Sequence, residues 1–385
     1  MGLPLRQSAH ALCVPVAERE YEGFASMAMS MEELMRGALD QRASDIHLKT
    51  GNPPIYRIDG SLRRLEDDVL TPERVHDLLK EIASPPDIAK FDKVMELDIS
   101  YMFEGIARFR VNVCRDDGDT RIVMRLIPLN IKTLEDLKLP PVLKKLCQLK
   151  NGLVLFTGPT GSGKSTSLAA MINEINTTRP DHVVTVEDPL EFVHPDKMGI
   201  ITQREVGHDT LSFANALRGA LRQDPDVILI GEMRDAETVR TALASAETGH
   251  LVFSTLHTVD AVETLNRILE FFEPHQQIQI RKQMASVLRG VISQRIIPLA
   301  AGVGRTVAAE VLIGTRTVRD FIDAGKAIKD IVALIEEGKD QWGMQTFDQA
   351  LFDKWKAQEI TTEIALQFAS SAKDLKLKMQ GMSVR

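Results

Sequence analysis

The residues best suited to chemistry form one glycine-rich stretch at 158–166. Its Gly-x4-Gly-Lys-Ser pattern is that of a phosphate-binding loop. The glycines allow a tight turn whose backbone N–H groups point at a polyphosphate. Lys164 can reach the β- and γ-phosphates, and the Ser165 hydroxyl can ligate Mg²⁺. We therefore expect a nucleotide to bind to Gly158, Pro159, Thr160, Gly161, Ser162, Gly163, Lys164, Ser165 and Thr166.

Two glutamates follow later apolar runs of the chain. Glu187 ends the run at 183–187, and Glu232 comes directly after the run at 227–231. Carboxylates at the carboxyl ends of parallel strands lie at the ligand edge of a sheet. We expect Glu187 to polarise the water that attacks the γ-phosphate, and Glu232 to hold Mg²⁺ and its waters. The alternative for Glu187 is an ordinary acidic turn started by Pro189.

Two histidines bracket a further apolar run at 251–255. His257 falls at the carboxyl end of this run, where a sensor of the γ-phosphate would lie. His250 lies at the other end, so a phosphate contact is less expected for it. Both residues can also be ordinary core or surface histidines. A zinc site is disfavoured, because no further Cys or His lies at ligand spacing.

Arginines are concentrated on two neighbouring predicted strands in the N-terminal part of the chain. One interpretation is a solvated basic face. The other is an arginine finger that reaches a nucleotide on a neighbouring subunit, because arginine stabilises the spread charge of phosphoryl transfer better than lysine does. The residues concerned are Arg108, Arg110, Arg115, Arg121 and Arg125.

The elements that position the phosphate loop and the glutamates alternate between strand and helix from residue 152 to 316. This alternation predicts an α/β fold with a doubly wound parallel sheet. A helix at 167–175 follows the phosphate loop, with its N-terminal dipole toward the anion. The predicted strands lie at 153–157, 183–187, 227–231 and 251–255, with later ones near 296–299 and 307–313.

The flanking regions have different patterns. Residues 31–128 predict a small α+β domain, residues 129–151 a linker with a short basic helix, and residues 317–385 a mostly helical region. Residues 1–30 are expected to be a flexible extension. Within the small domain we expect a helix at 31–39, a second from a Thr71 cap to Ile82 that Ser84-Pro85-Pro86 breaks, and strands at 45–48, 55–58, 97–102, 107–114 and 121–127.

The bulk composition excludes several classes of function. The chain has 385 residues, a net charge of −7 and no long apolar run, which disfavours nucleic-acid binding through a global basic field and a membrane span. Three scattered cysteines suit a reducing compartment and argue against a structural zinc site.

The motifs in this order resemble those of the secretion-type ATPases. The similarity runs from about residue 31 to 380, and within the family the chain resembles the type IV pilus retraction ATPases of the PilT/PilU group. It lacks the four-cysteine zinc site of the assembly ATPases, and residues 293–295 and 343–352 favour the PilU branch. The resemblance rests on the Walker A motif at 158–166, the Asp box at 186–194, the Walker B motif at 231–235, the His box at 248–258, and the segments 43–48 and 108–113 of the N-terminal domain.

The resemblance implies a cytoplasmic homohexamer held at the inner membrane by a platform protein of the pilus base. Each subunit would have a PAS-like N-terminal domain at 31–128 and a RecA-like P-loop ATPase core at 152–316. It would hydrolyse ATP with Mg²⁺ and power pilus retraction. By motif, Lys164 binds phosphate, Glu187 activates water, Glu232 and Ser165 hold Mg²⁺, His257 senses the γ-phosphate, and Arg110 and Arg125 supply the arginine contacts.

Three alternatives stay open. The first is a PilU-type ring member that binds ATP but depends on a PilT partner. The second is an ATPase of pilus assembly or type II secretion. The third, a nucleic-acid translocase, is disfavoured by the sequence pI of about 5.8.

Overall fold

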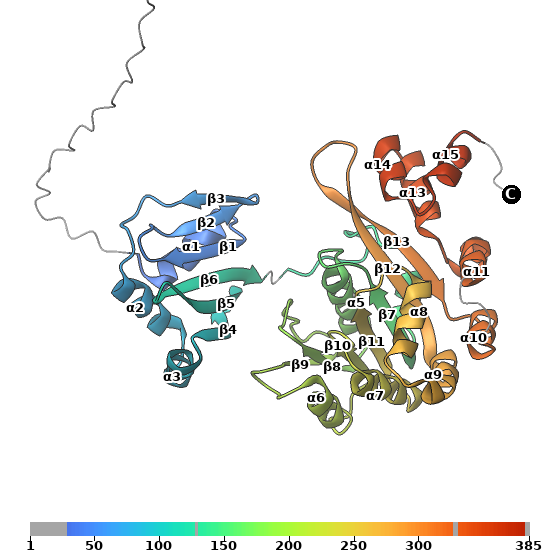
Figure 1. Ribbon diagram of the computed structural model, residues 1–385, viewed down its shortest axis with the longest axis horizontal. Helices are drawn as coiled ribbons and strands as arrows, with labels where there is room; N and C mark the ends of the chain where they lie inside the picture. The colour runs from blue at the N-terminus through green and yellow to red at the C-terminus, as the bar shows by residue number, and fades with distance from the viewer. Residues whose placement is uncertain (1–28, 128–129, 326–329, 382–385) are drawn as a thin grey trace, which may run out of the picture. The chain divides into compact units, whose positions relative to one another are not determined.

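The structure is a computed structural model, and it describes residues 29–127, 130–325 and 330–381 (Figure 1). The chain divides into two compact units whose main boundary lies between Leu126 and Ile127. Each unit is described by itself. Most of the predicted extension at 1–30 lies outside the described residues.

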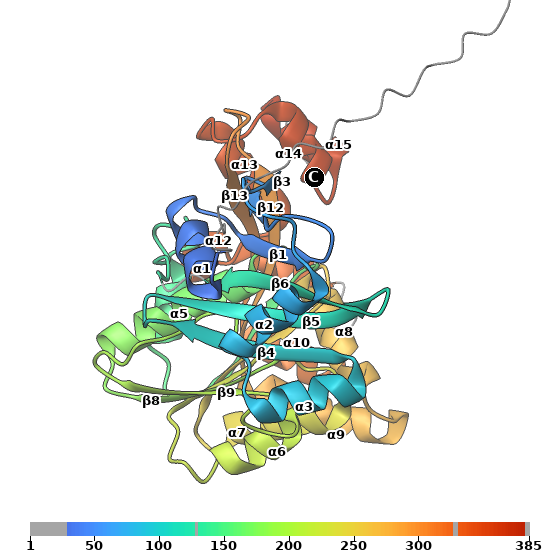
Figure 2. The same ribbon diagram turned by 90° about the vertical axis from the view of Figure 1, so that its left-hand side faces the viewer.

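The first unit is built on a six-stranded sheet with the order β3-β2-β1-β6-β5-β4 (Figure 1). Figure 2 shows β1, β6, β5 and β4 of this sheet from another side. Strand β1 pairs antiparallel with both β2 and β6. Alternating side chains along β5 are buried, as expected for a strand with one face on a core. The strands are β1 (Asp45–Lys49), β2 (Ile55–Ile58), β3 (Ser61–Arg64), β4 (Glu96–Phe103), β5 (Ala107–Asp116) and β6 (Asp119–Ile127).

Three helices complete this unit: α1 (Met31–Asp40), α2 (Pro72–Ile82) and α3 (Pro85–Val94). Thr71 caps α2 as predicted, and its side chain accepts a hydrogen bond from the Arg74 N–H. The expectation that Ser84-Pro85-Pro86 only breaks a helix was incomplete, because Ser84 caps a new helix, α3, with a proline at its start. Strand β3 was not predicted. The PAS-like relationship of this unit stays a prediction.

The second unit is built on a seven-stranded sheet with the order β13-β12-β7-β11-β10-β8-β9. Every neighbouring pair is parallel except β12 and β13, so an antiparallel strand ends one side of the predicted parallel sheet. The bounds are β7 (Gly152–Thr157), β8 (His182–Glu187), β9 (Ile200–Glu205), β10 (Val227–Ile230), β11 (Leu251–Leu256), β12 (Leu288–Pro298) and β13 (Arg305–Ile313).

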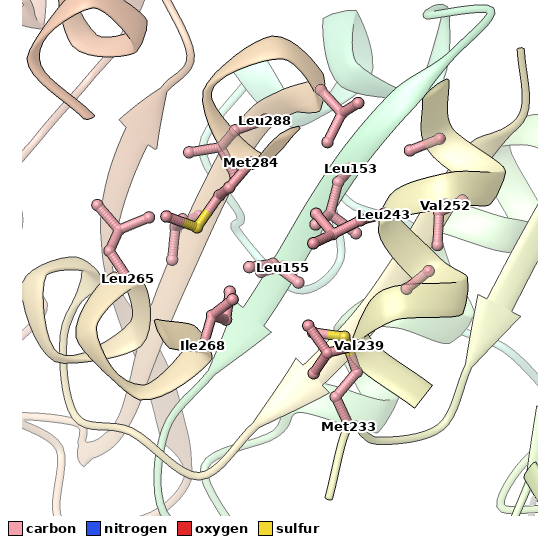
Figure 3. Close-up of a cluster of buried hydrophobic side chains, with 14 of the residues drawn as sticks. Leu153, Leu155, Met233, Val239, Leu243, Val252, Leu265, Ile268, Met284 and Leu288 are labelled. Carbon is pink, nitrogen blue, oxygen red and sulfur yellow. The ribbon is translucent and has the colours of Figure 1, made fainter. Parts of the chain in front are cut away.

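Helices cover both faces of this sheet and create two cores. Leu153 and Leu155 of the central strand β7 lie in one core, with side chains of α7 (Ala236–Glu247), α8 (Ala261–Glu270) and α9 (Pro274–Val287), as Figure 3 shows. Val154 and Phe156 alternate with them and lie in the other core, beneath α4 (Val142–Cys147) and α5 (Lys164–Thr178). Burial on both faces explains why β7 is apolar throughout.

The remaining helices are α6 (Phe213–Ala220), which precedes β10, and a group that follows β13. A separate small core joins β12 and β13 to this C-terminal group, in which α13, α14 and α15 lie together (Figure 1). The group consists of α10 (Arg316–Asp323), α11 (Ile331–Glu337), α12 (Lys339–Trp342), α13 (Phe347–Lys356), α14 (Thr362–Phe368) and α15 (Ala372–Met379). Among the described helices, none is both long enough and apolar enough to cross a bilayer.

Candidate active site

The phosphate loop joins the central strand β7 to helix α5. Gly158, Gly161 and Gly163 have φ values of +140°, +79° and +88°. A Cβ atom on Gly158 would stand 2.6 Å from the Gln294 carbonyl oxygen and from the Ser162 hydroxyl. Glycine is therefore required at this position by both conformation and space.

A cavity of about 430 Å³ opens beside this loop. Its size is in the range of small-molecule sites. Seven loop residues, 160–166, line it together with Glu187, Glu232 and His257, so the structure brings together the predicted groups of four separate motifs. Gly158 and Pro159 are not among the lining residues. Further lining residues are Leu168, Ala169, Asp188, Pro189, Glu191, Phe192, His194, Phe213, Leu229, Gly231, Thr255, Ile296 and Arg305.

Lys164 contacts the backbone of the loop directly. It begins α5 and is only 8% exposed. Its Nζ donates hydrogen bonds to the carbonyl oxygens of Gly158, at 2.7 Å, and Pro159, at 3.2 Å. Burial lowers the pKa of Lys164, and the Glu191 carboxylate opposes that effect. A buried ammonium at a helix N-terminus is suited to an anion with several charges.

Glu187 ends β8 and is half-buried. Its Oε1 accepts a hydrogen bond of 2.8 Å from the Thr185 hydroxyl. Burial raises the pKa of Glu187 to about 7, although the Thr185 bond acts in the opposite direction. A carboxylate with a pKa near neutrality is suited to accept a proton from water.

Glu232 and His257 lie together at the ends of neighbouring strands. His257 Nε2 is 3.2 Å from Glu232 Oε2. Arg234 forms ion pairs with Glu232 and, at 3.7 Å, with Asp188. Burial lowers the pKa of His257, and the positive charges of Lys164 and Arg234 add to this effect. These effects favour the neutral form of the imidazole.

Oxygen donors suited to Mg²⁺ line the same cavity, namely the Ser165 hydroxyl and the Glu232 carboxylate. Within the described ranges, no cluster of three or more His, Cys, Asp or Glu side chains forms a metal cage. This donor set still fits Mg²⁺, because proteins usually bind that ion through one or two oxygen ligands plus phosphate and water.

The two predicted arginines belong to the first unit and have different surroundings. Arg125, on β6, donates a 2.9 Å hydrogen bond to Asp45, which is 4% exposed. Arg110, on β5, lies 3.9 Å from the exposed Asp98. Arg125 therefore has a structural partner, whereas Arg110 has only a weak surface pair.

Sequence reasoning missed the contribution of the β12–β13 hairpin to the cavity. Ile296 and Arg305 line the cavity more than 100 residues after the phosphate loop. The Ile296 Cδ1 atom would stand 3.4 Å from a Cβ atom on Gly163. Neither residue belongs to a chemical motif, so their positions follow only from the pairing of β12 with β7 and of β13 with β12.

Comparisons with known proteins agree in their result. Residues 20–339 match the family described as type II/IV secretion system protein. The type IV pilus retraction ATPase PilT of Pseudomonas aeruginosa is 44% identical over 323 residues, which cover 84% of this chain and 93% of PilT. PilU, a type IV pilus ATPase of the same organism, is 40% identical over 352 residues, which cover 91% of this chain and 92% of PilU.

Solved structures give the same picture. A crystal structure of the pilus retraction motor PilT with bound ADP superposes with a TM-score of 0.85 at 42% identity, and the match covers 90% of this chain and 99% of that one. The ATPase DotB of Legionella pneumophila superposes with a TM-score of 0.73 at 28% identity, covering 92% of this chain and 97% of DotB.

Proposed function

The chain belongs to the type II/IV secretion system protein family, and from this premise we propose that it is a motor ATPase that powers retraction of type IV pili. The observation that carries the proposal is the single cavity that holds Lys164, Glu187, Glu232 and His257 beside the phosphate loop. The similarity to PilT and PilU covers more than four fifths of the chain. It supports the type IV pilus as the structure on which the motor acts.

In the proposed reaction the loop backbone and Lys164 bind the phosphates of ATP. Glu187 orients the attacking water and takes up its proton, and His257 contacts the γ-phosphate region. Ser165 and Glu232 would hold Mg²⁺, which when bound would supply positive charge against the phosphate oxygens. Catalysis then depends on positioning and charge stabilisation rather than on a covalent intermediate.

The mechanical part of the proposal concerns the two units. ATP hydrolysis shifts the first unit against the second in each subunit of a homohexamer. Arg110 and Arg125 would carry positive charge toward a nucleotide during this cycle. The ring acts on an inner-membrane platform protein from the cytoplasmic side. The PilT relative is described as a retraction ATPase, which supports retraction of the pilus rather than its extension.

The first test is hydrolysis of MgATP by purified Lys164→Ala, with Lys150→Ala as the control because Lys150 is exposed. We expect hydrolysis to fall to background in the first variant and to stay at the wild-type level in the second. Hydrolysis by Lys164→Ala at the wild-type rate would contradict the assignment of this site.

Deletion of the gene tests the proposed role in cells. It should leave the cells piliated but unable to twitch.

A PilU-type role is the second candidate. The alignment with PilU is the longer one, 352 residues against 323, whereas identity is higher with PilT. A ring member of this type would hydrolyse ATP or support retraction only beside a PilT partner. ATPase assays of the purified protein, with and without a PilT protein, distinguish the two roles.

A further inference from the structure

A loop without helix or strand, residues 188–194, forms one wall of the cavity. It begins directly after Glu187 and contributes Asp188, Glu191 and His194 to the lining. Such a wall has to be fixed by side chains, because it has no ladder of its own.

The region just beyond the loop is tied to helix α5. Asn176 is 1% exposed, and its Nδ2 donates a 2.8 Å hydrogen bond to the Pro195 carbonyl oxygen. Its Oδ1 accepts from the Lys197 N–H at 3.2 Å. These bonds hold the chain after the loop, but they do not reach residues 188–194.

The loop itself is held by Gln203 of the neighbouring strand β9. Gln203 Oε1 accepts a hydrogen bond of 2.8 Å from the His194 N–H. Gln203 Nε2 donates one of 2.9 Å to the Phe192 carbonyl oxygen. The side-chain amide thus binds both a donor and an acceptor of the loop backbone, as a strand partner would.

The same amide lies against the carboxylate that we assign to water activation. In the parallel pairing of β8 and β9, Gln203 is opposite Thr185, whose hydroxyl donates to Glu187. The Gln203 amide also contributes to lowering the pKa of Glu187 against the effect of burial. One side chain therefore contacts the wall of the cavity and the surroundings of Glu187.

We propose that Gln203 is a positioning residue for ATP hydrolysis, which holds loop 188–194 and the Glu187 carboxylate in their working orientation. The inference rests on the proposed function, because it assigns Glu187 to water activation. Gln203 itself is outside the cavity lining, so it acts through the loop and through Glu187.

Several charged groups also face Glu187 or share its cavity. Glu191 of the loop raises the pKa of Glu187. Lys164 of α5, Glu232 after β10 and His257 after β11 line the cavity, and Glu205 of β9 is opposite Glu187 in register. A change at Gln203 leaves Lys164, Glu232, His257 and Glu205 on their own elements but releases the loop that carries Glu191, so the pH profile reports the amide and the loop together.

The first experiment measures amide hydrogen exchange of the full chain, which does not depend on hydrolysis. In Gln203→Met, exchange at residues 188–194 should rise by about tenfold or more, with little change in α5. The control is Gln279→Met, because Gln279 is exposed on α9. Equal protection of the loop in both variants would overturn the proposal even if the protein proved not to be an ATPase.

The second experiment measures kcat, KM and the pH profile of MgATP hydrolysis. Gln203→Met should lower kcat by about 10- to 100-fold while KM changes much less. Gln203→Glu keeps an acceptor for His194 but places a carboxylate beside Glu187, so the pH of half-maximal rate should rise by about one unit. Unchanged kcat and pH profile in both variants would refute the positioning role. Absence of hydrolysis in the wild type, both alone and with a PilT protein, would instead refute the proposed function.

Discussion

At the scale of single residues, the protonation of Glu187 is expected to set the pH dependence of hydrolysis. Its pKa is raised to about 7 by burial, so at pH 6 most of the carboxyl is protonated and cannot accept a proton from water. The rate should therefore rise as the pH increases through 7. A rate that is flat between pH 6 and 8 would contradict this role.

Glu187→Gln keeps the shape of the side chain but removes the base. We expect hydrolysis to be lost while a fluorescent ATP analogue still binds, because the phosphate loop and Lys164 are untouched. If binding and hydrolysis are lost together, Glu187 is a structural residue instead. The exposed Glu337→Gln is the matched control.

The two predicted arginines of the first unit, Arg110 and Arg125, have different ion-pair partners, so their substitutions should affect stability differently. Arg125→Ala removes a hydrogen bond from the buried Asp45 and should lower the free energy of unfolding by about 1–3 kcal/mol. Arg110→Ala removes only a surface pair and should cost less than about 1 kcal/mol. Urea unfolding measures both. A loss of hydrolysis in Arg110→Ala with unchanged stability would support it as the arginine finger.

At the scale of elements, the sheet of the second unit depends on strand β7. Leu155→Ala would leave a cavity in the core shared with α7, α8 and α9, and should lower the free energy of unfolding by about 2–5 kcal/mol. Leu211→Ala is the control, because Leu211 is 88% exposed. Similar unfolding midpoints for the two variants would contradict this description of the core.

Elements with strong local signals were predicted correctly from the sequence. The cap at Thr71, the apolar run of β7 and the glycines of the phosphate loop each encode their structure within a few residues. Strand β9 was missed, because its residues are only partly buried at the sheet edge and have no clear alternation. Most of β12, residues 288–295, was missed because its start follows helix α9 without a turn signal.

The residues of the candidate site also fall into two groups, those that a sequence motif indicates and those that no motif indicates. The first group belongs to motifs of recognisable chemistry and consists of Lys164, Glu187, Glu232 and His257. The structure places these residues around one cavity. Gln203 and Arg305 have no motif of this kind. Their positions follow from the pairing of β9 with β8 and of β13 with β12, which a single sequence does not reveal.

At the scale of the whole molecule, a buried carboxylate connects stability to pH. Glu310 of β13 is 6% exposed and accepts a 2.9 Å hydrogen bond from the Ala261 N–H at the start of α8. Burial raises its pKa from 4.5 to about 7, and the nearby Asp260 and Asp348 add to this while Arg295 opposes it.

A raised pKa in the folded state means that folding favours the protonated carboxyl. This stabilisation is fully present below pH 4.5, the ordinary value, and is lost as the pH rises through 7. Relative to the wild type, Glu310→Gln should become more stable over this range by roughly 3 kcal/mol. Urea unfolding at pH 5 and pH 8 measures the difference, and a pH-independent difference would contradict it.

The place of β7 in the sheet also has a mechanical consequence. Parallel strands β11 and β12 flank it on both sides, and the phosphate loop is attached to its end. Bonds between parallel strands are evenly spaced along the chain, so a pull along β7 strains both ladders in shear at once instead of peeling them one bond at a time. Force that enters through the loop is thus spread over two rows of bonds, and the strand should yield only at high tension.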